Sequence, residues 1–242
     1  MAARRAYAAE ALGTFALVFA GAGAIMSGSM QGEPGHLGIS LVFGLVVMVC
    51  VYVFGGISGA HINPAVTLAL AVTGYFPARR VAAYILSQCV GAVAASVALR
   101  ELLGTAASAG ATRPTVGEWQ TLVIEAVLTG FLMLAVMTVV TGSEAVQRAG
   151  GLIIGGAVAL GALWAGPLTG ASMNPARSLG PALASGELGS LWLYVTGPIL
   201  GAVGGALLHE ALHGRFHAGR LVPTLARLNR RGGLIVTSGP RP

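Results

Sequence analysis

The 242-residue chain is 55% hydrophobic and only 9% charged, a balance that excludes a water-covered globular protein and places the chain in a membrane. Its 14 basic residues are all Arg and its 8 acidic residues are all Glu, which gives a net charge of +6 at pH 7. Because these Arg residues gather in the loops of one side and in the C-terminal segment, the charge indicates membrane orientation rather than nucleic-acid binding.

Six apolar stretches are each long enough to cross a hydrocarbon core about 30 Å thick. In chain order, the predicted membrane-spanning helices cover residues 7–26, 37–54, 81–99, 119–140, 149–166 and 191–212. The first stretch also resembles a secretory signal, but its apolar part is longer than the usual core of about 7–15 residues. In the last stretch, glycines spaced by four predict a face for close helix packing. They are Gly197, Gly201 and Gly205.

The distribution of Arg predicts which way the chain crosses the membrane. If the N-terminus is cytoplasmic, the loops on that side carry Arg4, Arg5, Arg79, Arg80 and Arg148. Arg-rich loops are typical of the cytoplasmic side, so both termini are expected there, in a protein of the plasma membrane. Residues 215–242 are predicted to form a flexible, Arg-rich cytoplasmic tail. A solvated tail is favoured over a sensor of anionic lipids.

The chain is an internal duplication. The turn Asn63-Pro64-Ala65 and its neighbours recur around Asn174-Pro175-Ala176. Residues 1–104 and 117–214 are therefore predicted to be the two halves of one membrane domain, 1–214, joined by a polar loop. Each half holds three spans, an odd number, so the second half enters the membrane from the opposite face. This arrangement is an inverted repeat.

A short apolar run follows each duplicated turn, over residues 65–72 and 176–184. Asn is a favoured N-cap and Pro a favoured first residue of a helix, so each turn is predicted to start a helix. About 10 residues reach only about 15 Å, half of the hydrocarbon core. Two such half-helices entering from opposite faces would meet N-terminus to N-terminus near the midplane. One Asn-Pro-Ala turn is typical of an ordinary helix cap, but two inverted copies indicate a functional site.

The meeting point of the half-helices has the properties of a selective pore. Two facing helix N-termini carry partial positive charge and unpaired backbone donors, and therefore repel cations. The side-chain amides of Asn63 and Asn174 can donate to a passing oxygen, which orients a water molecule so that it does not relay a proton. The sequence thus predicts a passive pore for small uncharged solutes.

These features resemble the aquaporin family of major intrinsic proteins, in its bacterial type, over residues 7–213. The resemblance identifies the two turns as the family's Asn-Pro-Ala boxes. It implies an all-α membrane fold with six transmembrane helices and two re-entrant half-helices, and a homotetramer with one pore in each subunit. Glu10 and Glu125 match the family's two membrane-embedded glutamates, which brace the re-entrant loops. Taken alone, each is equally a helix-packing Glu.

The resemblance also implies an outer selectivity filter. Its four positions are Phe43, Ala162, Ala171 and Arg177, the last directly after the second box. Narrow water pores of the family have His and a small polar residue where this chain has Ala162 and Ala171, so the opening is expected to be wider and less polar. The register within residues 161–167 is open by about one residue, with Leu163 or Trp164 as alternatives.

The main hypothesis is therefore a passive water channel that excludes ions and protons. One alternative is a facilitator of glycerol, urea or undissociated metalloid acids. The resemblance argues against the glycerol branch of the family, because this chain has Ser178 and Ala182 where members of that branch have Asp and a basic residue. The other alternative is a proton-coupled carrier that uses Glu10 or Glu125.

The remaining polar residues offer no reaction chemistry. The sequence carries no phosphate loop, nucleophile signature or metal-ligand spacing, so we expect no enzyme activity, no cofactor and no bound metal. His61 is predicted to be a hydrogen-bonded loop residue rather than a pH gate. The expected partners are water, small neutral solutes and the lipid bilayer.

Overall fold

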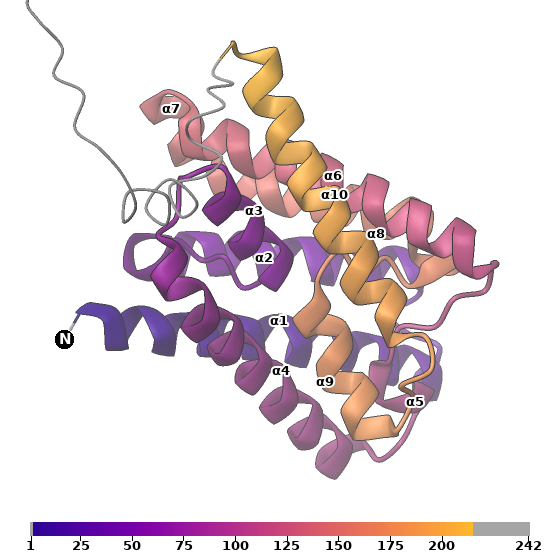
Figure 1. Cartoon of the computed structure of the whole chain (residues 1–242). Helices are drawn as coiled ribbons and strands as arrows, with labels where there is room; N and C mark the ends of the chain where they lie inside the picture. The colour runs from indigo at the N-terminus through magenta and orange to yellow at the C-terminus, as the bar shows by residue number, and fades with distance from the viewer. Residues whose placement is uncertain (1, 215–242) are drawn as a thin grey trace, which may run out of the picture.

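The computed structural model describes residues 2–214, which form a bundle of helices (Figure 1). In this part of the chain the helices are α1 (Ala2–Gln31), α2 (His36–Ser58), α3 (Pro64–Val72), η1 (Ala78–Arg80), α4 (Val81–Leu103), α5 (Ala107–Gly110), α6 (Glu118–Thr141), α7 (Glu144–Arg148), α8 (Gly150–Thr169), α9 (Pro175–Ser185) and α10 (Leu191–Leu212). The predicted tail, residues 215–242, lies outside the described residues.

Six of the described helices are long and apolar enough to cross a membrane, namely α1, α2, α4, α6, α8 and α10. They match the six predicted spans to within a few residues at most ends, so the predicted all-α membrane fold is confirmed. α1 begins well before the predicted span because Arg4 and Arg5 are good helix formers although they are polar. Hydropathy marks the part of a helix that suits lipid, not the point where the helix ends.

Helix packing repeats between the two halves. α1 packs along α4 and α2 in the first half, and α6 packs along α10 and α8 in the second. Each half-helix crosses to the other half, since α9 packs on α4 and α3 packs on α10. The predicted inverted repeat with two re-entrant half-helices is confirmed, and the exchange of half-helices joins the halves into one body.

The bundle has two ends and an apolar flank. Six crossings bring the start of α1 and the end of α10 to one face, which we call the terminal face; the opposite one is the far face (Figure 1). α3 and α7 lie towards the terminal face, and α5 and α9 towards the far face. Large apolar side chains are exposed on the outward helix surfaces, among them Leu12, Phe131, Leu160 and Trp192. Lipid is the solvent that suits such a surface.

Two short α-helices, α5 and α7, and the 3-10 turn η1 were not predicted, and all three lie in segments expected to be loops. α5 lies in the loop between the halves, where Ser108 (φ 51°) and Ala109 (φ 54°) have left-handed backbone conformations. It is thus a tight turn rather than a regular helix. α7 is a single exposed turn between α6 and α8. Segments this short carry no hydrophobic periodicity that a sequence pattern can reveal.

Glycines allow the closest contacts between helices. A Cβ atom on Gly201 of α10 would lie 2.0 Å from the carbonyl oxygen of Ala126 on α6. The equivalent atom on Gly91 of α4 would lie 2.1 Å from the carbonyl oxygen of Ala11 on α1. The predicted small-residue face of α10 is confirmed, and the first half has a matching contact.

Replacing Gly201 by Ala is expected to destabilise the protein by about 1–3 kcal/mol, because the added methyl group meets backbone atoms that move only if α6 and α10 separate. Thermal unfolding of the purified protein in detergent, followed by circular dichroism, measures this change. Gly204→Ala is the matched control, since a Cβ atom at that position of the same helix meets nothing within 4 Å. Equal stability of the two variants would contradict the close contact.

Candidate functional site

Asn63 and Asn174 begin the two half-helices. The Oδ1 atom of Asn63 accepts the N–H of Ala65 at 2.9 Å. The Oδ1 atom of Asn174 accepts the N–H groups of Ala176 at 3.0 Å and Arg177 at 3.3 Å. A proline follows each Asn as the first helical residue. The predicted helix starts are confirmed, and both are capped in the same way.

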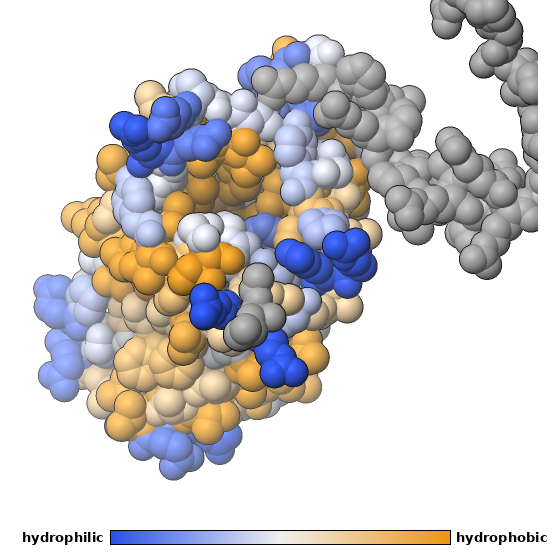
Figure 2. All heavy atoms as spheres, turned by 90° about the vertical axis from the view of Figure 1, so that its left-hand side faces the viewer, coloured by the Kyte–Doolittle hydropathy of each residue, from blue (hydrophilic) through white to orange (hydrophobic). Residues whose placement is uncertain are grey.

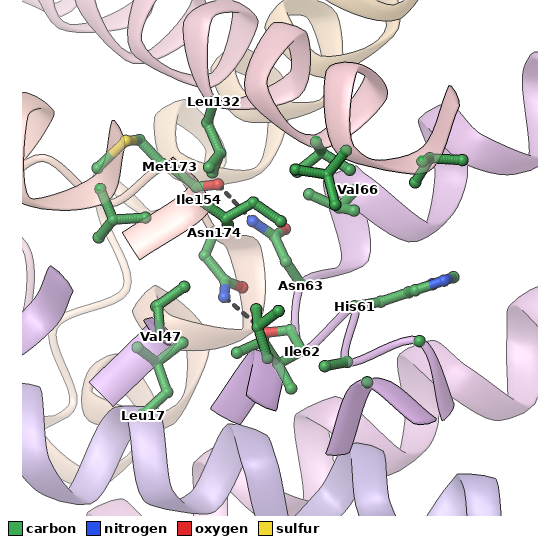
Figure 3. Close-up of a pocket in the computed structure, with 18 of the residues that line it drawn as sticks. Leu17, Val47, His61, Ile62, Asn63, Val66, Leu132, Ile154, Met173 and Asn174 are labelled. Atoms are coloured by element: carbon green, nitrogen blue, oxygen red, sulfur yellow. Dashed lines mark hydrogen bonds between the residues drawn. The ribbon is translucent and has the colours of Figure 1, made fainter. Parts of the chain in front are cut away.

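The same two Asn side chains join the loops to each other. The Nδ2 atom of Asn63 donates to the carbonyl oxygen of Met173 at 2.7 Å, and the Nδ2 atom of Asn174 donates to the carbonyl oxygen of Ile62 at 2.8 Å. Figure 3 shows the two amides side by side, with these bonds crossing between the loops. The N-termini of α3 and α9 therefore meet. Since each amide carries two N–H groups, one donor of each Asn stays available.

The backbone before each half-helix is strained at matching positions. Ala60 (φ 47°) and Ile62 (φ 42°) are left-handed in the first loop, as are Ala171 (φ 42°) and Met173 (φ 53°) in the second. This conformation is unfavourable for residues other than Gly, and most of all for a β-branched residue such as Ile62. Such strain persists only where the surroundings hold it, and it is typical of functional sites.

Glu125 holds the second loop from behind. It is fully buried on α6, and its carboxylate accepts the hydroxyl of Thr169 at 2.8 Å and the backbone N–H groups of Ser172 at 2.9 Å and Met173 at 2.8 Å. These contacts fix the strained segment directly before Asn174. A buried carboxylate with three donors is well satisfied.

Glu10 makes the corresponding contacts with the first loop. It is also fully buried, and it accepts the hydroxyl of Ser58 at 2.6 Å and the backbone N–H groups of His61 at 3.0 Å and Ile62 at 2.7 Å. A fourth donor is Nε2 of Gln88 at 2.7 Å. Both glutamates therefore make the contacts that a loop brace requires.

Two tyrosines of this framework were missed by sequence reasoning. The hydroxyl of Tyr84 donates to the carbonyl oxygen of Ser58 at 2.9 Å, and the hydroxyl of Tyr194 donates to that of Thr169 at 2.6 Å. Each bond fixes the end of a long helix just before the re-entrant loop. The signal was present in the sequence, because both pairs recur between the halves at nearly the same offset as the Asn-Pro-Ala turns.

A cavity of about 640 Å³ runs past the meeting point. Asn63 and Asn174 line its middle, surrounded by apolar side chains such as Leu17, Val47 and Leu132 (Figure 3). Towards the terminal face its lining includes polar residues of the rim. These are Tyr52, Tyr75, Gln147 and Arg148. Figure 2, which looks onto this face, shows a hollow with apolar surface inside and polar groups around it. Glu10 and Glu125 are not among the lining residues.

Arg177 places a buried cation beside the cavity. Its side chain is 2% exposed, Nη1 donates to the carbonyl oxygen of Gly110 at 3.2 Å, and Cζ lies 4.8 Å from the centre of the Phe43 ring. This geometry is a cation–π contact. Nε and Nη2 have no hydrogen-bond partner within residues 2–214. Phe43, Ala171 and Arg177 all line the cavity, so three of the four expected filter residues border the same space.

Ala162, the fourth expected filter residue, is buried on α8 but is not among the lining residues. Of the alternatives in register, Trp164 is 50% exposed and lies on the outer surface. Leu163 is half-buried, and its carbonyl oxygen contacts Nε2 of His36 at 2.6 Å. Ala162 is thus the one of these three whose side chain is buried inside the bundle.

His61 is held firmly within its loop. Its Nδ1 atom lies 3.1 Å from the hydroxyl of Thr67, and its ring contacts those of Phe76 and Tyr84, with ring centres 4.7 Å and 5.1 Å away. The predicted hydrogen-bonded loop histidine is what the structure contains. The ring also borders the cavity.

Comparison with known proteins agrees with this geometry. Residues 1–209 match the family model described as major intrinsic protein. The chain is 50% identical over 206 residues to aquaporin NIP1-1 of Zea mays, covering 84% of this chain and 73% of that protein. It is 43% identical over 211 residues to aquaporin NIP1-2 of Arabidopsis thaliana, covering 84% and 72%.

A solved structure gives the same fold. The X-ray structure of the aquaglyceroporin from Plasmodium falciparum superposes with a TM-score of 0.77 over 95% of this chain and 100% of that one. The two sequences are 22% identical, so this likeness concerns the fold alone.

Proposed function

The chain belongs to the major intrinsic protein family of membrane channels, and we propose on this premise that it is a passive water channel that excludes ions and protons. The observation that carries the proposal is the pair of crossed hydrogen bonds between Asn63 and Asn174 and the opposite loops. They bring two helix N-termini together beside a cavity whose wall is otherwise mainly apolar. The proposed filter is Phe43, Ala162, Ala171 and Arg177.

Cation exclusion follows from the charges at this point. Each helix N-terminus contributes about half a positive charge, and the guanidinium of Arg177 adds a full one within the same cavity. A cation that left water here would lose its hydration and meet only positive potential. A neutral solute meets donors instead, namely the remaining N–H of each Asn amide.

Proton exclusion follows from the orientation of these donors. A water molecule between Asn63 and Asn174 accepts from both amides through its oxygen, so its own hydrogens point away along the path. It then cannot accept a proton from one neighbour and pass another onward, and the positive potential adds to that barrier.

Stopped-flow light scattering of proteoliposomes tests the proposal. We expect the vesicles to shrink in a hyperosmotic buffer much faster than empty liposomes, with no dissipation of an imposed pH gradient. Water permeability equal to that of empty liposomes would refute the water channel. Accumulation of a solute driven by a proton gradient would refute any passive pore.

A wider opening is the second candidate function, and Ala171 supports it. This side chain lines the cavity beside Phe43 and Arg177, where narrow water pores carry a polar residue. We propose that solutes such as glycerol, urea or undissociated metalloid acids also pass.

Ala162→His is expected to lower glycerol and urea permeability more than water permeability, because an imidazole adds bulk and hydrogen-bonding groups at the proposed filter. The ratio of solute to water permeability in proteoliposomes measures the effect, which we expect to be roughly tenfold or more. Trp164→His introduces the same side chain on the outer surface of the same helix and is the matched control. Equal losses of water and solute flux would place the filter elsewhere.

The buried glutamates argue against a proton-coupled carrier. Glu10 and Glu125 do not line the cavity, and each carboxylate is occupied by donors from the loop that it holds. A carrier needs acids that solute and protons can reach. We propose that both residues are structural braces.

We further propose a homotetramer in the plasma membrane with the terminal face in the cytoplasm. Exposed Arg4, Arg5, Arg79 and Arg148 lie towards the terminal face, in α1, η1 and α7, the distribution expected of a cytoplasmic side. Polar groups at this face are visible in Figure 2. In this orientation residues 1–214 form the channel domain, and both ends of that domain are cytoplasmic.

A further inference from the structure

Gly21 of α1 lies directly against the ring of Phe43. A Cβ atom at Gly21 would be 2.2 Å from Cε1, 2.4 Å from Cζ and 2.7 Å from Cδ1 of that ring. Real Cβ atoms do not approach other atoms this closely. The ring therefore occupies the space that any side chain at position 21 would need.

The side of Phe43 that faces away from Gly21 borders Arg177 and the cavity. The guanidinium of Arg177 lies over the ring face, with Cζ 4.8 Å from the ring centre, and both side chains line the cavity. The ring is 8% exposed. It thus lies between the bare backbone of α1 and the cation that borders the pore.

We infer that Gly21 is a specificity-determining residue, which sets the width of the opening by letting the Phe43 ring rest against α1. This inference rests on the proposed function, because it assigns Phe43 and Arg177 to the filter. Gly21 itself does not line the cavity. Its effect on the filter is indirect, because it determines where the Phe43 ring lies.

The contact at Gly21 differs in kind from those at Gly91 and Gly201. At Gly91 and Gly201 the nearest atoms are backbone atoms of another helix, whereas at Gly21 all three nearest atoms belong to the outer end of the Phe43 side chain. A methyl group there displaces the ring and leaves the helices in place. Since the backbone of α1 blocks the other direction, the ring moves towards the cavity and narrows it.

Gly21→Ala tests the inference in proteoliposomes that are assayed for water, urea and glycerol permeability. We expect the ratio of glycerol to water permeability to fall roughly tenfold, the scale on which one methyl group changes discrimination in a fitted site. Gly23→Ala is the matched control on the same helix. A Cβ atom there has Leu99 Cδ2 at 3.2 Å as its one neighbour within 4 Å, so we expect the ratio to stay unchanged.

A double substitution separates steric action through Phe43 from a general effect on α1. In a Phe43→Ala background the conflicting ring is gone, so adding Gly21→Ala should leave the water, urea and glycerol permeabilities of that background unchanged. If Gly21→Ala alone fails to fold, recovery of folded protein in the double variant supports the same contact. A double variant that fails to fold, although Phe43→Ala alone folds, would overturn the inference, because Gly21 would then serve something other than Phe43.

The results distinguish this inference from the proposed function. A wild-type protein that conducts neither water nor glycerol above the level of empty liposomes refutes the function. A wild-type protein that conducts, together with a Gly21→Ala protein of unchanged or higher glycerol-to-water ratio, refutes only the role of Gly21.

Discussion

Glu125→Leu is expected to abolish stable folding or to reduce stability severely. Leu fills a similar volume but accepts no hydrogen bond, so the hydroxyl of Thr169 and the N–H groups of Ser172 and Met173 would lose their acceptor inside the bundle. Each buried donor left unpaired costs about 1–3 kcal/mol. The strained backbone at Met173 would also lose the contact that holds it. The total is several times the effect expected at Gly201.

Thermal unfolding in detergent and the yield of monodisperse protein measure this loss. Glu118→Leu is the matched control, since Glu118 is exposed at the start of the same helix. Glu125→Gln keeps one acceptor oxygen and should fall between Glu125→Leu and wild type. If Glu125→Leu were as stable as Glu118→Leu, the loop would be held by other contacts, and the bracing role would be wrong.

Arg177→Val is expected to produce the largest change in selectivity, by making the pore permeable to monovalent cations. A cation that passes about 4 Å from the guanidinium meets about 4 kcal/mol of repulsion at an effective dielectric constant of about 20. Removing that repulsion raises cation flux by up to roughly a thousandfold. The half-helix N-termini remain and keep part of the barrier.

Sodium flux and the decay of an imposed pH gradient in proteoliposomes measure this change, alongside water permeability. Arg148→Val removes the same charge at the rim, where the Arg148 side chain is 77% exposed and paired with Glu144. Solvent and salt screen that charge, so we expect little change in ion flux. An Arg177→Val protein that stays as tight to cations as wild type would assign the barrier to the helix termini alone.

The half-helices were predictable because their starts are encoded locally. Asn as N-cap and Pro at the first helical position are preferences of a few neighbouring residues, and the repeat of Asn63 at Asn174 revealed the inverted symmetry. The six spans were predictable for a similar reason, since length and hydropathy decide whether a helix suits lipid.

The crossed hydrogen bonds could not be predicted from the same pattern. Whether Asn63 donates to a solute or to Met173 depends on how two loops from opposite ends of the chain approach each other. The sequence predicted that each amide can donate to a passing oxygen, and the structure shows that one of the two donors of each amide is occupied by the opposite loop. Left-handed backbone at Ile62 is likewise a result of tertiary contacts with Glu10, because local preference argues against it.

The contacts of Arg177 could not be predicted from the sequence for another reason. Its partner Gly110 lies in the loop between the halves, which has neither periodicity nor a counterpart in the repeat. The contact of Phe43 with Gly21 depends on the rotation of α2 against α1, which hydropathy does not specify. The width of the opening therefore depends on tertiary contacts that a sequence pattern does not contain, and the assignment of Phe43, Ala162, Ala171 and Arg177 to a filter stays a prediction.

The crossed bonds also bear on how the protein is made. Asn63 and Met173 are 110 residues apart, so the ribosome adds the second partner roughly 5–20 s after the first at usual rates of synthesis. During this interval the first re-entrant loop has its Glu10 brace but lacks the opposing loop, and a polar loop at membrane depth is poorly tolerated without protein around it. We expect the first half to stay near the translocon, shielded from lipid, until the second half arrives. The pore is then completed only after the second half has been made.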